Sequence, residues 1–240
     1  MIFKITNHFF SIKNFELYKI FNMKKFDMDI IFKIDKKWFW RSDDTDLNTF
    51  KILSSETDLL ERVKPYLNGN SVVIQAGGNC GMQVDKFAEF FDTVYTFEPD
   101  PINFHCLVNN LPYKNVIKMQ CCLGNDHRMV SMNTLSDAIG GFYVNENHGN
   151  IPTLRIDDLN LSKCDFIQLD VEGYQLFALR GAEETILRFK PVISVELDWV
   201  ERYNFTKNDI ENFLMNLGYQ KVDTYTSDHI YVYKKLDFSL

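Results

Sequence analysis

A glycine-rich turn and an acidic residue that follows it form the first group that could bind a ligand. Gly77, Gly78 and Gly81 allow a sharp turn and let a ligand lie against bare main chain. Asn79 tolerates unusual backbone angles and offers a side-chain amide. Glu98 follows about 20 residues later, the spacing at which an acid accepts hydrogen bonds from the two hydroxyls of a ribose. We therefore predict a ligand that contains adenosine.

The order of the glycines indicates what the adenosine carries. It reads G-G-x-x-G, whereas dinucleotide-binding turns read G-x-G-x-x-G and phosphate-binding loops read G-x-x-x-x-G-K-S/T. S-adenosylmethionine has a ribose and no phosphate, so it suits this turn better than a dinucleotide does. Alternatively the turn only closes an α/β unit, but Glu98 at the expected distance favours a binding site.

Three acidic residues further along could act on a second substrate. Asp170 and Glu172 follow one apolar run, and Glu196 ends the next. Ligands of open α/β sheets bind at the carboxyl ends of strands, so we expect the three carboxylates to converge there. They could position an acceptor, remove its proton, or hold one divalent cation. The alternative is that Asp170 and Glu172 cap a helix and that Glu196 bonds to backbone.

One histidine is a further candidate base. His148 lies between Asn147 and Gly149 in a loop that could close over the cleft, and imidazole titrates near neutral pH. An exposed loop histidine can equally be no more than a solvated side chain.

Strand and helix patterns alternate along the chain and must position these groups. Apolar stripes at i, i+3, i+4 and i+7 predict helices between the strands, and this alternation requires a parallel sheet. The last two strands are joined by too few residues for a parallel crossover, so they must be antiparallel. The fold is therefore α/β, with a mostly parallel seven-stranded sheet and an antiparallel last strand. Its predicted strands comprise residues 72–74, 93–97, 116–121, 166–170, 192–196, 219–225 and 230–233.

Two segments lie outside this pattern. Residues 1–50 form an N-terminal extension, in which residues 29–40 predict a β-hairpin, and residues 51–240 form the nucleotide-binding domain. A helical lead-in is predicted over residues 45–67, and the segment is expected to cover an edge or the mouth of the cleft. Residues 128–152 predict an inserted pair of strands.

The amino-acid composition limits which kinds of partner the protein can bind. The net charge of −7 argues against a protein whose main role is to bind nucleic-acid phosphates. No segment predicts a transmembrane span or a signal peptide, and five cysteines without metal-site spacing indicate reduced, mostly buried thiols. We expect a cytoplasmic protein that acts on a small molecule, with no nucleic-acid or membrane partner.

From Ser71 onward the chain resembles the FkbM-type S-adenosylmethionine-dependent methyltransferases. The resemblance implies a class I, Rossmann-like methyltransferase that methylates oxygen, with a hydroxyl of a sugar or small metabolite as acceptor. The matching motifs are, in order, Gly77-x-Asn79-x-Gly81, Phe97-Glu98-Pro99, Leu107 with Asn110, Ile156-Asp157-Asp158-Leu159, Asp170-Val171-Glu172-Gly173, Leu179-x-Gly181-Ala182 and Pro191 to Glu196.

The resemblance also extends the cofactor site. Pro99 belongs to a shared motif, and Cys122 and Leu123 match positions at which the family contacts the adenine ring. Two positions depart from the family, which usually has Asp where this chain has Gln75 and Lys where it has Gln168. Gln75 can still form a neutral hydrogen bond to a cofactor group, but it lacks the charge that favours the cofactor's ammonium.

Two other functions stay open. One is an NAD-binding oxidoreductase, which the missing G-x-G-x-x-G pattern and the acidic cluster disfavour. The other is a degenerate cofactor-binding or interaction module without catalysis, which Gln75 and Gln168 leave possible.

Overall fold

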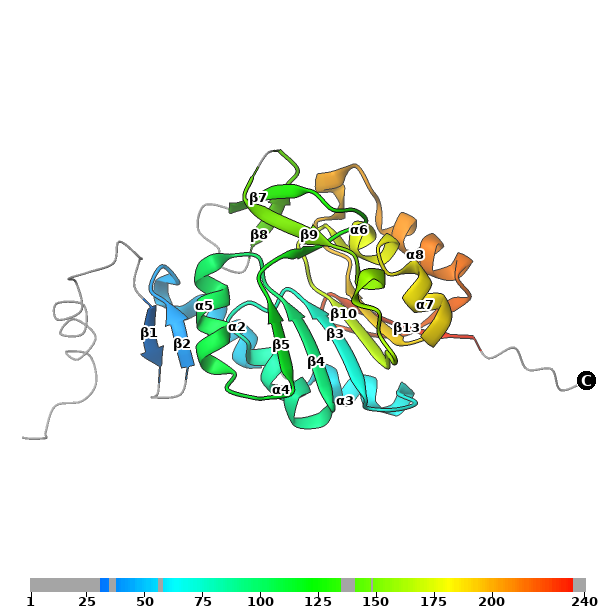
Figure 1. Ribbon diagram of the computed structural model, residues 1–240, viewed down its shortest axis with the longest axis horizontal. Coiled ribbons are helices and arrows are strands. Elements are labelled where there is room, and N and C mark those ends of the chain that lie inside the picture. Colours follow the sequence, from blue (N-terminus) through cyan, green and yellow to red (C-terminus); the bar gives the residue numbers. More distant parts are fainter. Residues whose placement is uncertain (1–30, 35–37, 56–57, 135–140, 148, 235–240) are drawn as a thin grey trace, which may run out of the picture.

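A seven-stranded mixed sheet lies at the centre of the computed structural model, which describes residues 31–34, 38–55, 58–134, 141–147 and 149–234 (Figure 1). The strand order is β12-β13-β11-β10-β3-β4-β5, and β13 is antiparallel to both of its neighbours. This confirms the predicted sheet. The strands are β3 (Val72–Ala76), β4 (Thr93–Phe97), β5 (Val116–Met119), β10 (Phe166–Leu169), β11 (Val192–Glu196), β12 (Tyr219–Tyr225) and β13 (Asp228–Tyr233).

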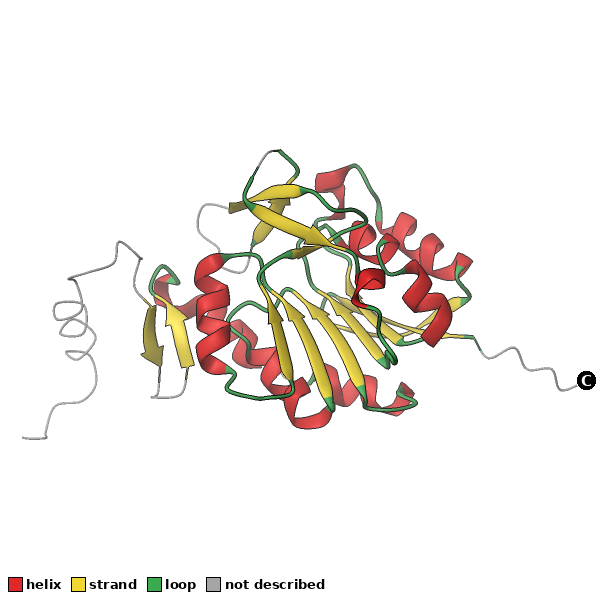
Figure 2. Cartoon of the chain, viewed as in Figure 1, coloured by secondary structure: helices red, strands yellow, loops and turns green. Residues whose placement is uncertain are grey.

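Helices cover both faces of this sheet (Figure 2). Successive side chains of a strand point to opposite faces, so Val73 packs into one apolar core and Ile74 into the other. The first core lies under α3 (Leu59–Val63), α4 (Met82–Phe90) and α5 (Pro101–Asn110). The second lies under α6 (Gln175–Arg180), α7 (Glu183–Phe189) and α8 (Lys207–Asn216). None of the described helices combines the length and the apolar character that a membrane-spanning helix requires.

A second, smaller sheet lies above the carboxyl ends of β3, β4 and β5 (Figure 1). It contains the predicted strand pair, β7 (Met129–Thr134) and β8 (Phe142–Asn145), which is antiparallel. It also contains β6 (Cys122–Leu123) and β9 (Ile151–Leu154), in the order β6-β9-β7-β8. These two strands were not predicted, because β6 is too short to show alternation and β9 includes Pro152, which cannot donate to a ladder.

The N-terminal segment packs along α5. Strands β1 (Ile31–Ile34) and β2 (Trp38–Arg41) are antiparallel, as predicted for a hairpin, although residues 35–37 lie outside the described residues. They precede the helical turn η1 (Thr45–Leu47), helix α2 (Asn48–Ser55), α3 and the turn η2 (Lys64–Tyr66). The assignment of residues 1–50 and 51–240 to separate units stays a prediction.

Asn110 at the end of α5 joins β2 to the domain. Its Oδ1 accepts a hydrogen bond from Phe39 N at 2.6 Å, and its Nδ2 donates to Phe39 O at 2.9 Å. The same Nδ2 donates to Cys80 O at 2.7 Å, in the glycine-rich turn. One side chain therefore connects the N-terminal segment, α5 and the turn.

We expect Asn110→Ala to lower the free energy of unfolding by about 1–3 kcal/mol, because the backbone groups of Phe39 and Cys80 lose their partners. Asn109→Ala is the matched control, since Asn109 is exposed and, among the described residues, its side chain donates to His105 O of its own helix. Chemical denaturation of both variants measures the difference. Equal stability of the two would show that Asn110 does not anchor the segment.

Candidate active site

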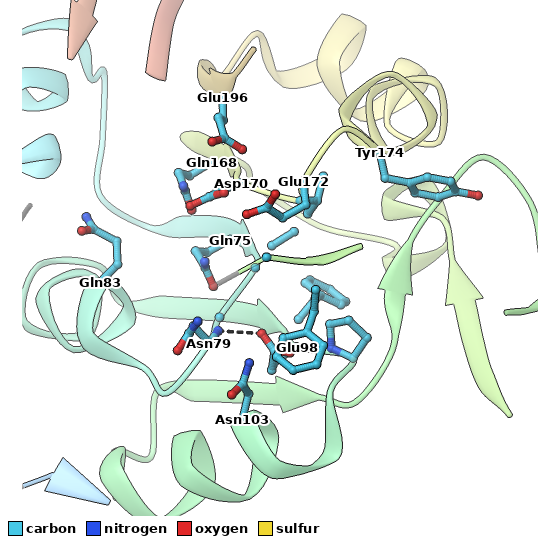
Figure 3. A pocket seen from close by; sticks show the side chains of 18 of the residues that line it. Gln75, Asn79, Gln83, Glu98, Asn103, Gln168, Asp170, Glu172, Tyr174 and Glu196 are labelled. Carbon is cyan, nitrogen blue, oxygen red and sulfur yellow. Dashed lines mark hydrogen bonds between the residues drawn. The ribbon is translucent and has the colours of Figure 1, made fainter. Parts of the chain in front are cut away.

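The carboxyl ends of β3, β4, β10 and β11 open into one cleft of about 420 Å³ (Figure 3). Most residues predicted to bind a cofactor line it, and so do the three predicted carboxylates Asp170, Glu172 and Glu196. Gly81 does not line the cleft, and His148 lies outside the described residues. The cofactor candidates in the lining are Gln75, Gly77, Gly78, Asn79, Glu98, Pro99, Cys122 and Leu123.

The glycine-rich turn brings the ends of β3 and β10 into direct contact. Gly77 has φ +84°, and a Cβ built on it would lie 1.8 Å from the backbone oxygen of Asp170. Gly81 has φ +97° and Asn79 has φ +46°, both in the left-handed region that favours these residue types. Gly77 is thus required by the packing of two strand ends, whether or not a ligand is bound.

The amide groups of the turn are already used within the protein. All five N–H groups from residue 77 to residue 81 donate to nearby oxygens, so none is free to bind a phosphate. Among the described residues, no donor lies against the carbonyl oxygens of Gly77 and Asn79, and carbonyl oxygens suit a cationic group. The acceptors of the five bonds are Phe97 O for Gly77 and Gly78, Glu98 Oε2 for Asn79, Asn79 Oδ1 for Cys80 and Gly78 O for Gly81.

Glu98 is buried beside this turn, with 4% of its surface exposed. One carboxylate oxygen accepts from Asn79 N at 2.6 Å (Figure 3), and the other accepts from Asp100 N at 2.8 Å. Burial raises the pKa of Glu98 to about 7, although the two backbone donors oppose the shift. The side chain is therefore held in one orientation and changes charge near neutral pH.

The two positions that depart from the family are neighbours in the sheet. Gln75 and Gln168 are Cα partners on the parallel strands β3 and β10, and both are buried. Gln75 Oε1 accepts a hydrogen bond from Thr96 Oγ1 at 2.6 Å. Gln168 Oε1 has no partner among the described residues, and its side chain lies next to Asp170 and Glu196 (Figure 3).

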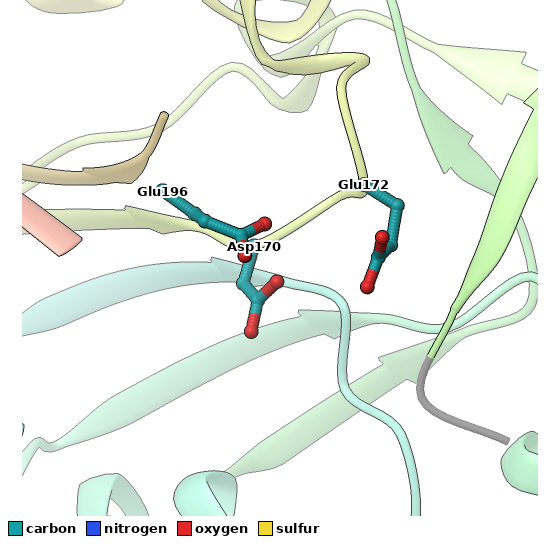
Figure 4. Close-up of side chains that lie close together, drawn as sticks. All are labelled: Asp170, Glu172 and Glu196. Atoms are coloured by element: carbon teal, nitrogen blue, oxygen red, sulfur yellow. The ribbon is translucent and has the colours of Figure 1, made fainter. Parts of the chain in front are cut away.

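The three carboxylates meet as predicted (Figure 4). One oxygen from each of Asp170, Glu172 and Glu196 lies within 4.8 Å of the other two. The following helix α6 has Tyr174 as its N-cap residue, with no side-chain hydrogen bond to the cap among the described residues. The interpretation that Asp170 and Glu172 cap this helix stays a prediction.

Burial and mutual repulsion set the charges of this group. Burial, and then the Asp170 carboxylate, raise the pKa of Glu172 to about 7, while Arg202 opposes the shift. Arg202 Nη1 lies 3.1 Å from Glu172 Oε2 and also donates to its backbone oxygen at 2.9 Å. Burial, followed by the charges of Asp170 and Glu172, raises the pKa of Glu196 to about 11. These shifts favour a proton held within the group of three, which relieves the repulsion between the carboxylates.

Several lining residues were not predicted from the sequence. Tyr174 and Trp199 each follow a predicted acid by a few positions, so an aromatic residue near the motif was a usable sign for both. Trp199 is half exposed, and the guanidinium of Arg202 lies over its ring, 4.6 Å from the centroid. Thr49, Ile52 and Leu53 belong to the segment that was expected to cover an edge or the mouth of the cleft, although these side chains were not named. Met132, Phe142 and Val144 of the small sheet and residues 225–228 also line the cleft, and their positions depend on tertiary docking, which leaves no local sign.

Comparison with known proteins gives one family. The model of the Methyltransferase FkbM domain matches residues 75–221. No curated protein matches the chain. The solved structure of Methyltransferase FkbM from Methylobacillus flagellatus KT is 20% identical, with a TM-score of 0.54. The match covers 74% of this chain and 48% of that one, so this chain spans about half the length of that protein. At this identity the likeness shows the fold alone.

Two further structures have lower TM-scores. Precorrin-6y C5,15-methyltransferase from Geobacter metallireducens GS-15 is 12% identical with a TM-score of 0.47, over 84% of this chain and 96% of that one. A SAM dependent methyltransferase from Aquifex aeolicus is 13% identical with a TM-score of 0.42, over 76% and 96%.

The contact between Gly77 and Asp170 predicts a large effect of the smallest side chain. Gly77→Ala should lower the free energy of unfolding by about 3 kcal/mol or more, because the added methyl group overlaps a backbone oxygen. Gly124→Ala is the control, since a Cβ at Gly124 would lie 3.5 Å or more from its neighbours. Chemical denaturation compares the two. If Gly77→Ala is as stable as the control, the packing of the two strand ends does not require a glycine here. The glycine would then serve ligand binding alone.

Proposed function

The chain belongs to the FkbM methyltransferase domain family, and from this we propose that it transfers the methyl group of S-adenosylmethionine to a hydroxyl oxygen of a sugar or other small metabolite. The observation that carries the proposal is the arrangement of the cleft. The glycine-rich turn and Glu98 line one half, and three converging carboxylates line the other, so a cofactor and an acceptor can meet between them.

The lining suits a cationic cofactor. Among the described residues that line the cleft, five are acidic and none is Lys, Arg or His. S-adenosylmethionine carries a sulfonium and an ammonium, which favour such surroundings, whereas the pyrophosphate of NAD would meet neither cations nor free amides. This supports S-adenosylmethionine over an oxidoreductase cofactor. The five acids are Glu98, Asp170, Glu172, Glu196 and Asp228.

Specific residues fit the parts of this cofactor. Glu98, when ionised, can accept hydrogen bonds from both ribose hydroxyls while it keeps its two backbone donors. Cys122 and Leu123 are buried and apolar, and they present a wall on which an adenine ring can pack. The carbonyl oxygens of Gly77 and Asn79 can accept from the ammonium. When bound, the cofactor supplies an electrophilic methyl group.

The carboxylates then serve the acceptor. An alcohol must lose its proton as the new C–O bond forms, and a base acts best when its pKa is near the working pH. Glu172 has this property, and Arg202 holds it in place. Burial and the charges of Asp170 and Glu172 raise the pKa of Glu196, so its protonated form is favoured and can donate a hydrogen bond that orients the acceptor. We assign the base to Glu172, with Asp170 and Glu196 as orienting groups.

A divalent cation is the alternative source of positive charge. One oxygen each from Asp170, Glu172 and Glu196 could bind Mg²⁺, and Gln168 Oε1 is a further oxygen without a partner among the described residues. A proton held within the group offsets part of the repulsion when no cation is bound, so the two explanations predict different responses to a chelator.

The cofactor assignment predicts a loss of affinity in Glu98→Gln. S-adenosylmethionine should bind more weakly by about 1.5–3 kcal/mol, the range for hydrogen bonds to a charged group. Titration calorimetry measures this, with the exposed Glu89→Gln on α4 as the control. Unchanged affinity in the folded variant would remove Glu98 from the site. A wild-type protein that binds NAD and not S-adenosylmethionine would contradict the proposed function itself.

The base assignment predicts a separate effect on turnover. Glu172→Gln should lower turnover by about 10²–10⁴-fold and leave cofactor affinity within a few-fold, because a general base contributes in that range. The wild-type rate should rise with pH through about 7, where Glu172 loses its proton. Release of S-adenosylhomocysteine across a panel of sugars and metabolites measures turnover, and Glu201→Gln, exposed on the helical turn η4 (Val200–Tyr203), is the control.

The same assay distinguishes a base from a cation. With Glu172 as base, EDTA should leave the rate unchanged. If EDTA stops the reaction and Mg²⁺ restores it, the carboxylates hold a cation instead. Loss of cofactor binding in Glu172→Gln would place this acid beside the cofactor and return the search for a base to His148.

A further inference from the structure

Arg41 connects the N-terminal segment to the cofactor half of the cleft, although it lies outside the residues that match the family model. It is at the end of β2 and only 4% exposed. Its Nη1 donates to Asp100 Oδ1 at 2.6 Å and to Asn103 Oδ1 at 3.2 Å. On its other edge, Nε and Nη2 donate to Asp43 at 2.9 and 2.6 Å.

Asp100 is the link between Arg41 and Glu98. The backbone N of Asp100 donates to Glu98 Oε1 at 2.8 Å. Its side chain is the N-cap of α5, where Oδ1 accepts from Ile102 N at 3.0 Å and Asn103 N at 2.9 Å. The residue that Arg41 binds therefore also holds one oxygen of Glu98.

Arg41 also reaches the opposite wall of the cleft. Its guanidinium lies over the ring of Phe142, 4.7 Å from the centroid, and Phe142 lines the cleft from β8. An arginine over an aromatic face is attracted by the ring electrons. Arg41 thus contacts α5 on one side of the cofactor half and the small sheet on the other.

We propose that Arg41 is a positioning residue for the cofactor site, which fixes Asp100 and offsets its charge so that Glu98 stays oriented and ionised for the ribose. This rests on the proposed use of S-adenosylmethionine. It makes the N-terminal segment part of the site, although Arg41 itself does not line the cleft.

The charges around Glu98 give the proposal a measurable consequence. Asp100, in the loop before α5, is the acid that raises the pKa of Glu98 beyond the effect of burial. Cys80 in the turn and Cys122 on β6 also face it, but burial raises the pKa of both thiols, so they are neutral. Among the described residues, Arg41 is the cation that pairs with Asp100, and Asp43 shares its charge from the other edge of the guanidinium. Without Arg41, the charge of Asp100 would act on Glu98 uncompensated.

The test is the affinity for S-adenosylmethionine as a function of pH, measured by titration calorimetry on the full chain. In the wild type, affinity should rise with pH through about 7, since the ribose needs the ionised form of Glu98. In Arg41→Met the midpoint should move upward by about one pH unit, the low end of the effect of one nearby charge. Arg41→Lys, which keeps the charge, should stay close to the wild type.

A second substitution should reverse the shift. Asp100→Asn keeps a side chain that can cap α5 but removes the negative charge, so the double variant with Arg41→Met should return toward the wild-type midpoint. Asp100→Asn alone should lower the midpoint. Arg188→Met, exposed at the end of α7, is the matched control and should change nothing.

The outcomes separate the possible failures. An Arg41→Met midpoint equal to that of the wild type overturns the proposal, even if affinity falls equally at every pH, because that result indicates a packing role alone. If Arg41→Met does not fold, Arg41→Gln carries the same expectation with a neutral side chain that still donates to Asp100. An unchanged midpoint in Asp100→Asn overturns it independently. Failure of the wild type to bind S-adenosylmethionine contradicts the proposed function instead.

Discussion

The cleft depends on the contact between Gly77 and the backbone of Asp170. These residues end β3 and β10, adjacent parallel strands at which the chain turns from one half of the sheet to the other. Because no side chain separates them, the two strand ends lie against each other and then diverge. One leads to the turn held by Glu98, and the other leads to Glu172. A ligand site at such a switch point is a general property of open α/β sheets.

Two arginines form ion pairs with acidic residues in or next to the cleft, and both contact the strand β8. Arg41 pairs with Asp100 next to Glu98, and Arg202 pairs with Glu172 in the group of three carboxylates. Each also lies over an aromatic ring of β8: Arg41 over Phe142, and Arg202 over Tyr143 at 4.5 Å. Successive residues of a strand face opposite sides, so β8 is held between the two cations. The acids of both halves are therefore linked through a strand of the small sheet.

Local patterns in the sequence were sufficient to predict the main sheet. They were also sufficient to predict that the three carboxylates lie close together. Strand and helix periods are local, and the rule that ligands bind at the carboxyl ends of strands places Asp170 and Glu196 together. What the sequence could not show is which backbone groups are already occupied. Three of the five amides of the turn donate to Phe97 and Glu98, and this follows only from the register of β3 and β4. Arg41 was missed for the same reason, since its partner Asp100 is 59 positions away.

The differences from the family pattern at Gln75 and Gln168 are best explained together. Gln75 and Gln168 are register partners on β3 and β10, so the Asp and Lys that the family usually has at these positions would lie side by side. Loss of one charge from a buried pair is costly, whereas replacement of both by neutral groups is often tolerated. The paired exchange keeps the sheet interior neutral, and Thr96 satisfies the oxygen of Gln75. It removes one carboxylate from the lining of the cleft, at Gln75, and leaves Glu98, Asp170, Glu172 and Glu196 in place. Taken together, the two glutamines therefore do not favour a degenerate, non-catalytic protein over an enzyme.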